Sequence, residues 1–291
     1  MRDIKRRIRS VSSIEKITNA MRLVSAAKLR RARNVFNRTN ESLDFIEDSI
    51  DKLCSSTEEI PSRYMAGTRE IKRTCYIIVT SNKGLAGSYN FNIFKTAEQK
   101  MKEAAEQQTQ GDKEKPLLVC IGGKGAKYFS RRGFEILSEY MEPPENISFQ
   151  EIKDLTEPVI ELYDNGEIDE VILVYTEFFS TLEQRAVART LLPFERKEED
   201  EKSKLKHLPE YEPDPASVFD YLVPKYAEIL TYHALLEAAT CEHAARRMAM
   251  QNATDNAHEM TEQLELFYNQ ARQAAITNEM TEIVSGADAI R

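Results

Sequence analysis

The sequence predicts an α/β protein in which two long terminal helices pair as a coiled coil and flank a small central sheet domain. Three observations lead to this fold class. Helix-breaking residues are confined to the middle of the chain, apolar residues near both ends recur with heptad spacing, and short apolar runs in the middle alternate with helical segments. We therefore expect an N-terminal coiled-coil helix at residues 1–60, a central α/β domain at 61–208 and a C-terminal coiled-coil helix at 209–291.

Proline and glycine are missing from both ends of the chain. No proline precedes Pro61, no glycine precedes Gly67, and neither residue occurs between Lys225 and Ser285. Because an interior proline costs a helix about 3 kcal/mol and a glycine about 1 kcal/mol, such ends favour long helices, each reaching about 90 Å at about 1.5 Å per residue. Helices of that length must bury their apolar stripes against each other or against a partner.

In the C-terminal segment, apolar residues step by three and four along a single register, as in a left-handed coiled coil. The register runs through Ile229, Tyr232, Leu236, Ala239, His243, Arg246, Met250, Ala253, Ala257, Met260, Leu264, Phe267, Ala271 and Ala274. Before it, Asp214 and Pro215 predict an N-cap followed by proline at the first helical position, and Pro224 predicts a kink or a restart near Asp220. Beyond Ala274 the register positions become polar, so the last turns are expected to do something other than pair with the N-terminal helix.

The apolar stripe of the N-terminal segment is less regular. It forms three stretches in shifted registers: Ile4, Ile8 and Val11; then Ile14, Ile17, Met21 and Val24; then Leu29, Ala32, Phe36, Thr39, Leu43, Ile46, Ile50 and Leu53. Shifts of this kind unwind or overwind a coil locally, or let the stripe drift around the helix. We therefore expect a less uniform seam on this helix than on the C-terminal one.

Between the helices, apolar runs typical of buried strands alternate with helical segments. Strands are expected at residues 75–80, 116–121, 171–176 and 186–192, the last two as a candidate hairpin, and helices at about 90–108, 127–132 and 152–163. This alternation favours a small, mostly parallel sheet. Residues 196–207 are rich in charge and are expected to form a linker or exposed loop, followed by an extended segment at 209–215.

Charge is distributed unevenly along the chain. The formal net charge is −8, yet residues 1–38 carry twelve Lys or Arg and two acids, a net of +10, which leaves −18 on the remainder. A basic arm on an acidic protein indicates either nucleic-acid binding or a surface for an acidic protein partner. The plain alternative is a solvated helix face, although charge this one-sided is uncommon on a merely solvated helix.

Residue patterns that carry chemistry are sparse. The glycine-containing segments at residues 81–88 and 121–127 follow expected strands, but neither matches a P-loop or a dinucleotide fingerprint, so tight turns with close helix–sheet packing are favoured over phosphate binding. The four cysteines and four histidines lack metal-binding spacing, and we expect reduced, buried thiols, no metal and no cofactor. No apolar run suits a membrane span, and the first residues do not form a secretory signal.

Five sequence segments resemble one known family. Residues 1–11, beginning Met1-Arg-Asp-Ile-Lys-Arg-Arg, and residues 14–29 closely resemble the start of the gamma subunit of F-type ATP synthase. Residues 80–90, which contain Gly-Leu-Ala-Gly, are similar to that family's Gly-Leu-Cys-Gly signature, and residues 242–257 and 269–286 are similar to its C-terminal signatures. The sequence departs from the family at Asn82 and Lys83, where Asp-Arg is usual, and at Ala86, where Cys is frequent.

The resemblance implies an antiparallel coiled coil beside a small Rossmann-like sheet domain, and a non-catalytic rotor subunit. In this family the coil penetrates a hexamer of alternating α and β subunits, while the α/β domain and the lower coil bind the epsilon subunit and the membrane ring of c subunits. Ion flow turns the ring and the shaft, and the shaft drives the β catalytic sites through successive states. The implied location is the cytoplasmic face of the bacterial plasma membrane, with membrane association only through the complex.

Residues expected to contact the hexamer follow from the same resemblance. On the N-terminal helix they are Met21, Arg22, Lys28, Arg30, Arg31 and Arg33, and on the C-terminal helix they are Arg246, Gln273, Thr277, Glu279, Thr281 and Glu282. Coil packing is the alternative for Met21 and Arg246, because both lie on predicted seams. Two other functions stay open from the residues alone: a nucleic-acid-binding or scaffolding coiled coil, and a nucleotide-dependent enzyme built on the central sheet.

Overall fold

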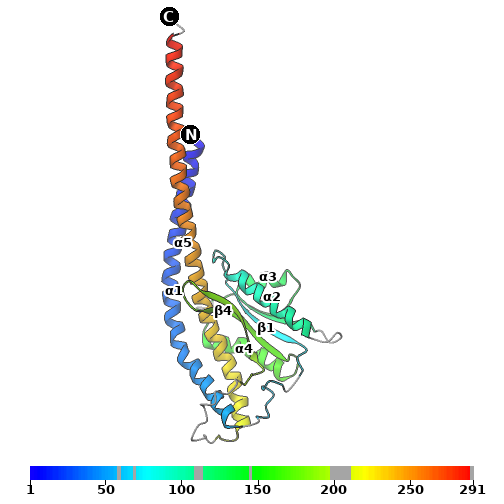
Figure 1. The fold of residues 1–291 in the computed structure, drawn as a ribbon. Helices are drawn as coiled ribbons and strands as arrows, with labels where there is room; N and C mark the ends of the chain where they lie inside the picture. The colour runs from blue at the N-terminus through cyan, green and yellow to red at the C-terminus, as the bar shows by residue number, and fades with distance from the viewer. Residues whose placement is uncertain (58–59, 68–69, 108–113, 144–145, 197–210, 289–291) are drawn as a thin grey trace. The chain divides into compact units, whose positions relative to one another are not determined.

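The computed structural model describes residues 1–57, 60–67, 70–107, 114–143, 146–196 and 211–288 (Figure 1). Contacts within the chain divide it into two compact units. The terminal unit comprises Met1–Ala26 and Arg246–Arg291, and the central unit comprises Ala27–Ala245. Of the charged loop expected at residues 196–207, all but Arg196 lies outside the described residues.

Two helices account for both ends of the chain. α1 spans Arg2–Ser56 and α5 spans Pro215–Asp288. As predicted, Asp214 caps α5, because its carboxylate accepts a hydrogen bond from the Ser217 backbone N–H at 2.9 Å. Of the kink or restart predicted near Asp220, the restart is wrong, since α5 continues through Pro224 without interruption. Burial explains how the helix tolerates it, because packing of neighbouring side chains in the core offsets the missing backbone hydrogen bond.

The central unit contains a five-stranded sheet in the order β3-β2-β1-β4-β5. Its strands are β1 (Thr74–Val79), β2 (Leu117–Ile121), β3 (Glu135–Tyr140), β4 (Glu170–Phe178) and β5 (Gln184–Leu192), and its helices are α2 (Tyr89–Gln107), α3 (Gly123–Ser130) and α4 (Phe149–Asp164). The first four strands are parallel, and β5 pairs antiparallel with β4. This arrangement confirms both the mostly parallel sheet and the hairpin.

Helices cover both faces of this sheet. Successive residues of β1 point to opposite faces, as the pleat of a strand requires. Tyr76 and Ile78 pack in the cluster formed with α2 and α3. Cys75, Ile77 and Val79 pack in the opposite cluster with α4 and with the central-unit parts of α1 and α5. The two long helices are therefore part of the α/β core in this unit.

Two central elements differ from the predicted ones. β3 is absent from the predicted strands because its sequence mixes glutamates with apolar residues, and its side chains alternate between exposed and half-buried at the edge of the sheet. α3 begins at Gly123 and ends at Ser130, whereas the sequence predicts it at 127–132. The helix starts directly after β2, in the glycine turn itself, so glycines are part of its first turn.

One stretch of α5 in the central unit is enclosed on all sides. Every residue from Ala234 to Ala244 is buried. The Tyr89 hydroxyl of α2 donates to the Ala238 carbonyl at 3.2 Å, and the Cys241 thiol lies 3.3 Å from a β4 carbonyl. A single heptad seam therefore does not describe this stretch, because α5 packs against the sheet domain as well as against α1.

The seam of α1 keeps one register where shifts were predicted. In the terminal unit its buried and half-buried positions step by four and three residues through Ile4, Ile8, Val11, Glu15, Thr18, Arg22 and Ser25. In the central unit the predicted positions from Leu29 to Leu53 are buried or half-buried, and Leu29 follows Ser25 by four residues. The predicted second register is wrong, since Ile14 is 50%, Ile17 60% and Val24 58% exposed. In this stretch Glu15, Thr18 and Ser25 face inward, where the prediction placed Ile14, Ile17 and Val24.

The same exchange occurs on α5 in the terminal unit, where the two helices run side by side in opposite directions (Figure 1). The positions Met250, Ala257, Leu264 and Ala271 are buried or half-buried, as predicted. The predicted Ala253 is half-buried too, next to the half-buried Thr254. Further along, the half-buried residues are Thr261 and Tyr268, whereas the predicted Met260 and Phe267 are 51% and 57% exposed. The predicted seam is thus correct through Ala257, and beyond it correct at Leu264 and Ala271 but one residue off at Met260 and Phe267.

Candidate functional site

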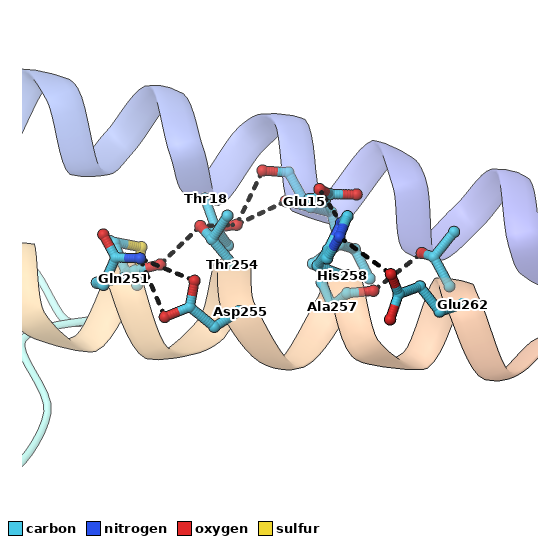
Figure 2. Close-up of polar contacts among 11 residues, drawn as sticks. Glu15, Thr18, Gln251, Thr254, Asp255, Ala257, His258 and Glu262 are labelled. Atoms are coloured by element: carbon cyan, nitrogen blue, oxygen red, sulfur yellow. Dashed lines mark hydrogen bonds and ion pairs between the residues drawn. The ribbon is translucent and has the colours of Figure 1, made fainter.

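Polar side chains join the two helices across the seam of the terminal unit (Figure 2). The Thr254 hydroxyl donates to the Thr18 hydroxyl oxygen at 2.8 Å. Further along the pair, His258 Nδ1 lies 3.1 Å from Glu15 Oε1, and the other ring nitrogen lies 3.5 Å from Glu262 Oε1. Polar residues at coiled-coil seams specify register and orientation at a cost in stability. These contacts explain why α1 and α5 pair in this alignment although the largest apolar side chains point away.

Large apolar side chains face outward in the terminal unit. On α1 they are Ile14, Ile17, Leu23 and Val24, and on α5 they are Met260, Leu266 and Phe267, all at least 50% exposed. A coil that existed only for its own stability would place such residues in the seam. Exposed apolar surface of this extent marks a site of interaction with other proteins.

Met21, Arg22 and Arg246 are half-buried within the terminal unit. The Arg22 guanidinium donates to Asn19 Oδ1 at 2.8 Å on its own helix. Met21 lies beside the inward position held by Arg22, so part of its surface contributes to the coil. Coil packing, the alternative prediction, therefore accounts for the buried part of these side chains. The other part of each is accessible to solvent.

The last turns of α5 extend past the beginning of α1 (Figure 1). The predicted contact residues Gln273, Thr277, Glu279, Thr281 and Glu282 are all exposed there. The Thr277 and Thr281 hydroxyls donate to carbonyls of their own helix at 2.9 and 2.8 Å. This confirms that the last turns do not continue the seam with α1.

Sequence reasoning missed an apolar stripe in the same turns. Ile276 is 50%, Met280 62% and Ile283 66% exposed, and they step by four and three residues. The signal was present in the sequence, but it lies on a different face from the register that was followed. The end of α5 is thus an amphipathic helix whose apolar side has no cover among the described residues.

In the central unit, the predicted Lys28, Arg30, Arg31 and Arg33 are all exposed on α1. Arg30 and Arg31 share one exposed face of α1 with Ala27, Asn34, Val35 and Arg38. The Arg33 guanidinium carbon instead lies 5.5 Å from the centroid of the Phe178 ring at the end of β4. The structure therefore gathers part of the basic set into one patch and directs Arg33 toward the sheet.

The glycine turn after β2 brings backbone and side chains close together. A Cβ at Gly122, whose φ is +102°, would lie 2.1 Å from the Thr80 carbonyl oxygen, so only glycine fits. Asn82 Oδ1 accepts a hydrogen bond from the Gly123 backbone N–H at 2.8 Å, at the helix N-terminus where an anion would bind. Close packing is confirmed as the reason for the glycine at 122 in this turn.

All four cysteines are free and buried, as predicted. Burial raises the pKa of the Cys54 thiol to about 11 and that of Cys75 and Cys120 to about 12. A thiol needs its thiolate form to react, so these groups are inert near pH 7. Among the described residues, no cluster of His, Cys, Asp and Glu suits a metal ion, and no helix has the length and apolarity to cross a membrane.

Fold and contacts together define a class of protein: one unit is an antiparallel helix pair with polar contacts inside its seam and apolar side chains outside, and the other is a mostly parallel α/β unit. The family model described as ATP synthase matches residues 1–290. The ATP synthase gamma chain of Alkaliphilus metalliredigens is 43% identical over 295 residues, covering 100% of this chain and 99% of that one. A gamma chain of Acetobacterium woodii described as sodium ion specific is 38% identical over 307 residues, covering 100% and 98%.

A solved structure shows the same fold. It is described as the central stalk and c-ring of the Tetrahymena thermophila mitochondrial ATP synthase, and it matches with a TM-score of 0.59 at 23% identity, covering 81% of this chain and 99% of that one. The chain belongs to the family of ATP synthase gamma chains, the non-catalytic central-stalk subunit of the F-type enzyme.

Proposed function

We propose that this chain is the rotor shaft that couples transmembrane ion flow to ATP synthesis or hydrolysis. It turns inside a hexamer of α and β subunits and drives the β catalytic sites through successive states, and it thereby regulates ATPase activity and ion flow. The observation that carries this proposal is the coil of the terminal unit, which exposes its large apolar side chains on both helices. A shaft needs such surface to touch a surrounding ring of subunits, and membership in the gamma-chain family supports this role.

The contact residues are proposed along the same lines. The side chains on α1 face acidic loops of the β subunits: Met21, Arg22, Lys28, Arg30, Arg31 and Arg33. Those on α5 make the upper contact with the hexamer: Arg246, Gln273, Thr277, Glu279, Thr281 and Glu282. Long-range attraction between the net +10 of residues 1–38 and an acidic partner does not demand one geometry. A rotor requires this property, because each orientation favours a given β state only through its differential contact energy.

The remaining partners are the epsilon subunit and the ring of c subunits. The central α/β domain, at about residues 61–208, and the adjoining parts of the helices at 1–60 and 209–291 supply the surface for them. Through this assembly the chain resides peripherally at the cytoplasmic face of the bacterial plasma membrane. The exposed Phe45 and Tyr221, at 75% and 67%, provide apolar surface on α1 and α5 of the central unit for such contacts.

Reconstitution tests the proposal directly. The chain is mixed with α and β subunits, the complex is isolated, and ATP hydrolysis is measured for the mixture, the chain alone and the two subunits without it. We expect one copy of the chain per hexamer and steady hydrolysis only in the complete mixture. A mixture that never forms this complex, or turnover by the chain alone, would overturn the proposal. Salt-sensitive DNA binding in place of assembly would instead support a nucleic-acid function.

A further inference from the structure

Arg189 on β5 reaches both long helices in the central unit. Its Nη2 donates to Glu47 Oε1 of α1 at 2.6 Å and to the Tyr226 hydroxyl oxygen of α5 at 3.1 Å. The Arg189 side chain is 34% exposed and that of Glu47 is 23% exposed, while Tyr226 is buried. Charge-assisted hydrogen bonds are short and geometrically specific, and partial burial limits their screening by salt. One guanidinium therefore ties the sheet to two helices.

A second polar link joins α1 and α5 nearby. His233 Nε2 lies 2.9 Å from Asn40 Oδ1. Asn40 precedes Glu47 by seven residues and His233 follows Tyr226 by seven, so the link lies about two turns further along the antiparallel pair. Burial and the nearby Arg189 charge lower the pKa of His233, so its ring is neutral at pH 7 and Nε2–H donates to the amide oxygen. This link is independent of the sheet, whereas the Arg189 link is not.

Apolar packing alone does not oppose every motion of α1 against the sheet. Leu43, Ile46 and Ile50 bury α1 in the core, but the hydrophobic effect is non-directional. A hydrogen bond weakens steeply when its angle falls below about 120°. The packed core already resists turning of the helices about their own axes. The Arg189 contacts add a directional restraint on the same motion.

We propose that Arg189 is a positioning residue for torque: with Glu47 and Tyr226 it makes the sheet domain and the two helices of the central unit turn as one body. The inference rests on the proposed rotor function, because only a rotating shaft carries torque between its elements. Arg189 touches no reacting group. Its effect is to convert rotation of the sheet domain into rotation of α1 and α5 without slip at β5.

The test measures torsional stiffness in the assembled complex. The α–β hexamer is immobilised, and a bead is attached either to the sheet domain through Ser130→Cys on α3 or to α1 through Asn37→Cys, both exposed positions. The native cysteines are buried, so the bead labels only the introduced thiol. Angular fluctuations of the bead during pauses report the stiffness between bead and hexamer. In Arg189→Met we expect a loss of stiffness for the bead on α3 and no change for the bead on α1.

Two further variants separate torque transfer from folding. Tyr226→Phe removes one hydroxyl and keeps the ring, and we expect a smaller loss of stiffness at α3. The exchange Arg189→Glu with Glu47→Arg restores the ion pair and is expected to restore part of the stiffness. Arg185→Met is the matched control on the same strand, since its partner Glu183 lies two residues away and both side chains are exposed. It should leave both beads unchanged.

The outcomes distinguish this inference from the function on which it rests. Equal stiffness at α3 in wild type and Arg189→Met, with or without a lower melting temperature, would show that Arg189 only stabilises the fold and would overturn the inference. Failure of the wild-type complex to rotate at all would overturn the rotor function and the inference with it.

Discussion

Glu237 is a carboxylic acid buried where α5 meets the end of β4. It is 7% exposed, and its carboxylate accepts a hydrogen bond from the Phe178 backbone N–H at 2.9 Å. Burial raises the pKa of Glu237 to about 7, the Glu177 charge adds to the rise, and the Phe178 N–H and Arg189 oppose it. The folded protein therefore holds a proton on Glu237 at pH values where the unfolded chain has lost it.

The direction of the resulting pH dependence follows from linkage. A raised pKa contributes stability that is fully present below the unfolded value near 4.5 and is lost as pH rises through about 7. Glu237→Gln is neutral at every pH and keeps an oxygen for the Phe178 N–H. We expect it to match the wild type at pH 4.5 and to exceed it at pH 8 by up to about 3 kcal/mol, measured by urea unfolding of the chain at both values. Glu161→Gln, at an exposed position on α4, should change neither. Equal pH slopes in wild type and Glu237→Gln would contradict this account.

At the scale of elements, the seam between α1 and α5 in the terminal unit depends on hydroxyls. Thr18 is 9% exposed, and its hydroxyl lies 3.1 Å from the Ile14 carbonyl while its oxygen accepts from Thr254. A hydroxyl has one proton and can accept as well as donate, and the Thr254 hydroxyl also lies 2.8 Å from the Met250 carbonyl of its own helix. The two threonines therefore share a contact across the coil and are each close to a backbone carbonyl. Removing one member leaves the other without its partner across the coil, whereas removing both leaves two apolar side chains of similar shape.

A double-mutant cycle tests this pairing. We expect Thr18→Val and Thr254→Val each to lower the unfolding free energy by up to about 1 kcal/mol, and the double variant to lose less than the two together. Thr277→Val is the matched control, because its hydroxyl bonds only the Gln273 carbonyl on the same helix at an exposed site. Strictly additive losses in the cycle would show that the two hydroxyls do not act together.

At the scale of the whole molecule, the end of α5 makes little contact with the rest of the described chain. Side chains from Arg272 to Ile283 are all exposed. Removing residues 273–291 should therefore leave the unfolding free energy of the isolated chain unchanged to within about 0.5 kcal/mol, as for surface changes in general. The same deletion should weaken binding to α and β subunits, because it removes the apolar stripe of Ile276, Met280 and Ile283.

A point variant sharpens that prediction. Ile276→Glu with Met280→Glu keeps the length of α5 and removes only its apolar side. We expect normal thermal unfolding of the chain and a weaker complex by sedimentation or gel filtration. A large loss of stability in the isolated chain would instead show that these side chains pack on the chain itself.

Much of the fold was predictable because its causes are local. Helix-breaking residues act on their own backbone, so their absence predicted α1 and α5. β1, β2 and β4 are buried on both faces, and a continuous apolar run records that burial directly. β3 escaped prediction because its pairing is supplied by β2, while its own residues alternate at an edge. That the predicted residues on α1 and α5 contact other subunits remains a prediction, because the structure reports only how exposed each side chain is.

By itself, then, the sequence determined the two terminal helices, the α/β order between them and the family to which the chain belongs. Only the tertiary structure decided which side of each helix faces inward. Polar Glu15 and Thr18 fill the seam, and Ile14 and Ile17 face out, because each polar group finds its partner more than 200 residues away on α5. Periodicity along one helix contains no information about such a partner. The link from Arg189 to Glu47 and Tyr226 has the same origin, since three elements distant in sequence must meet before it exists.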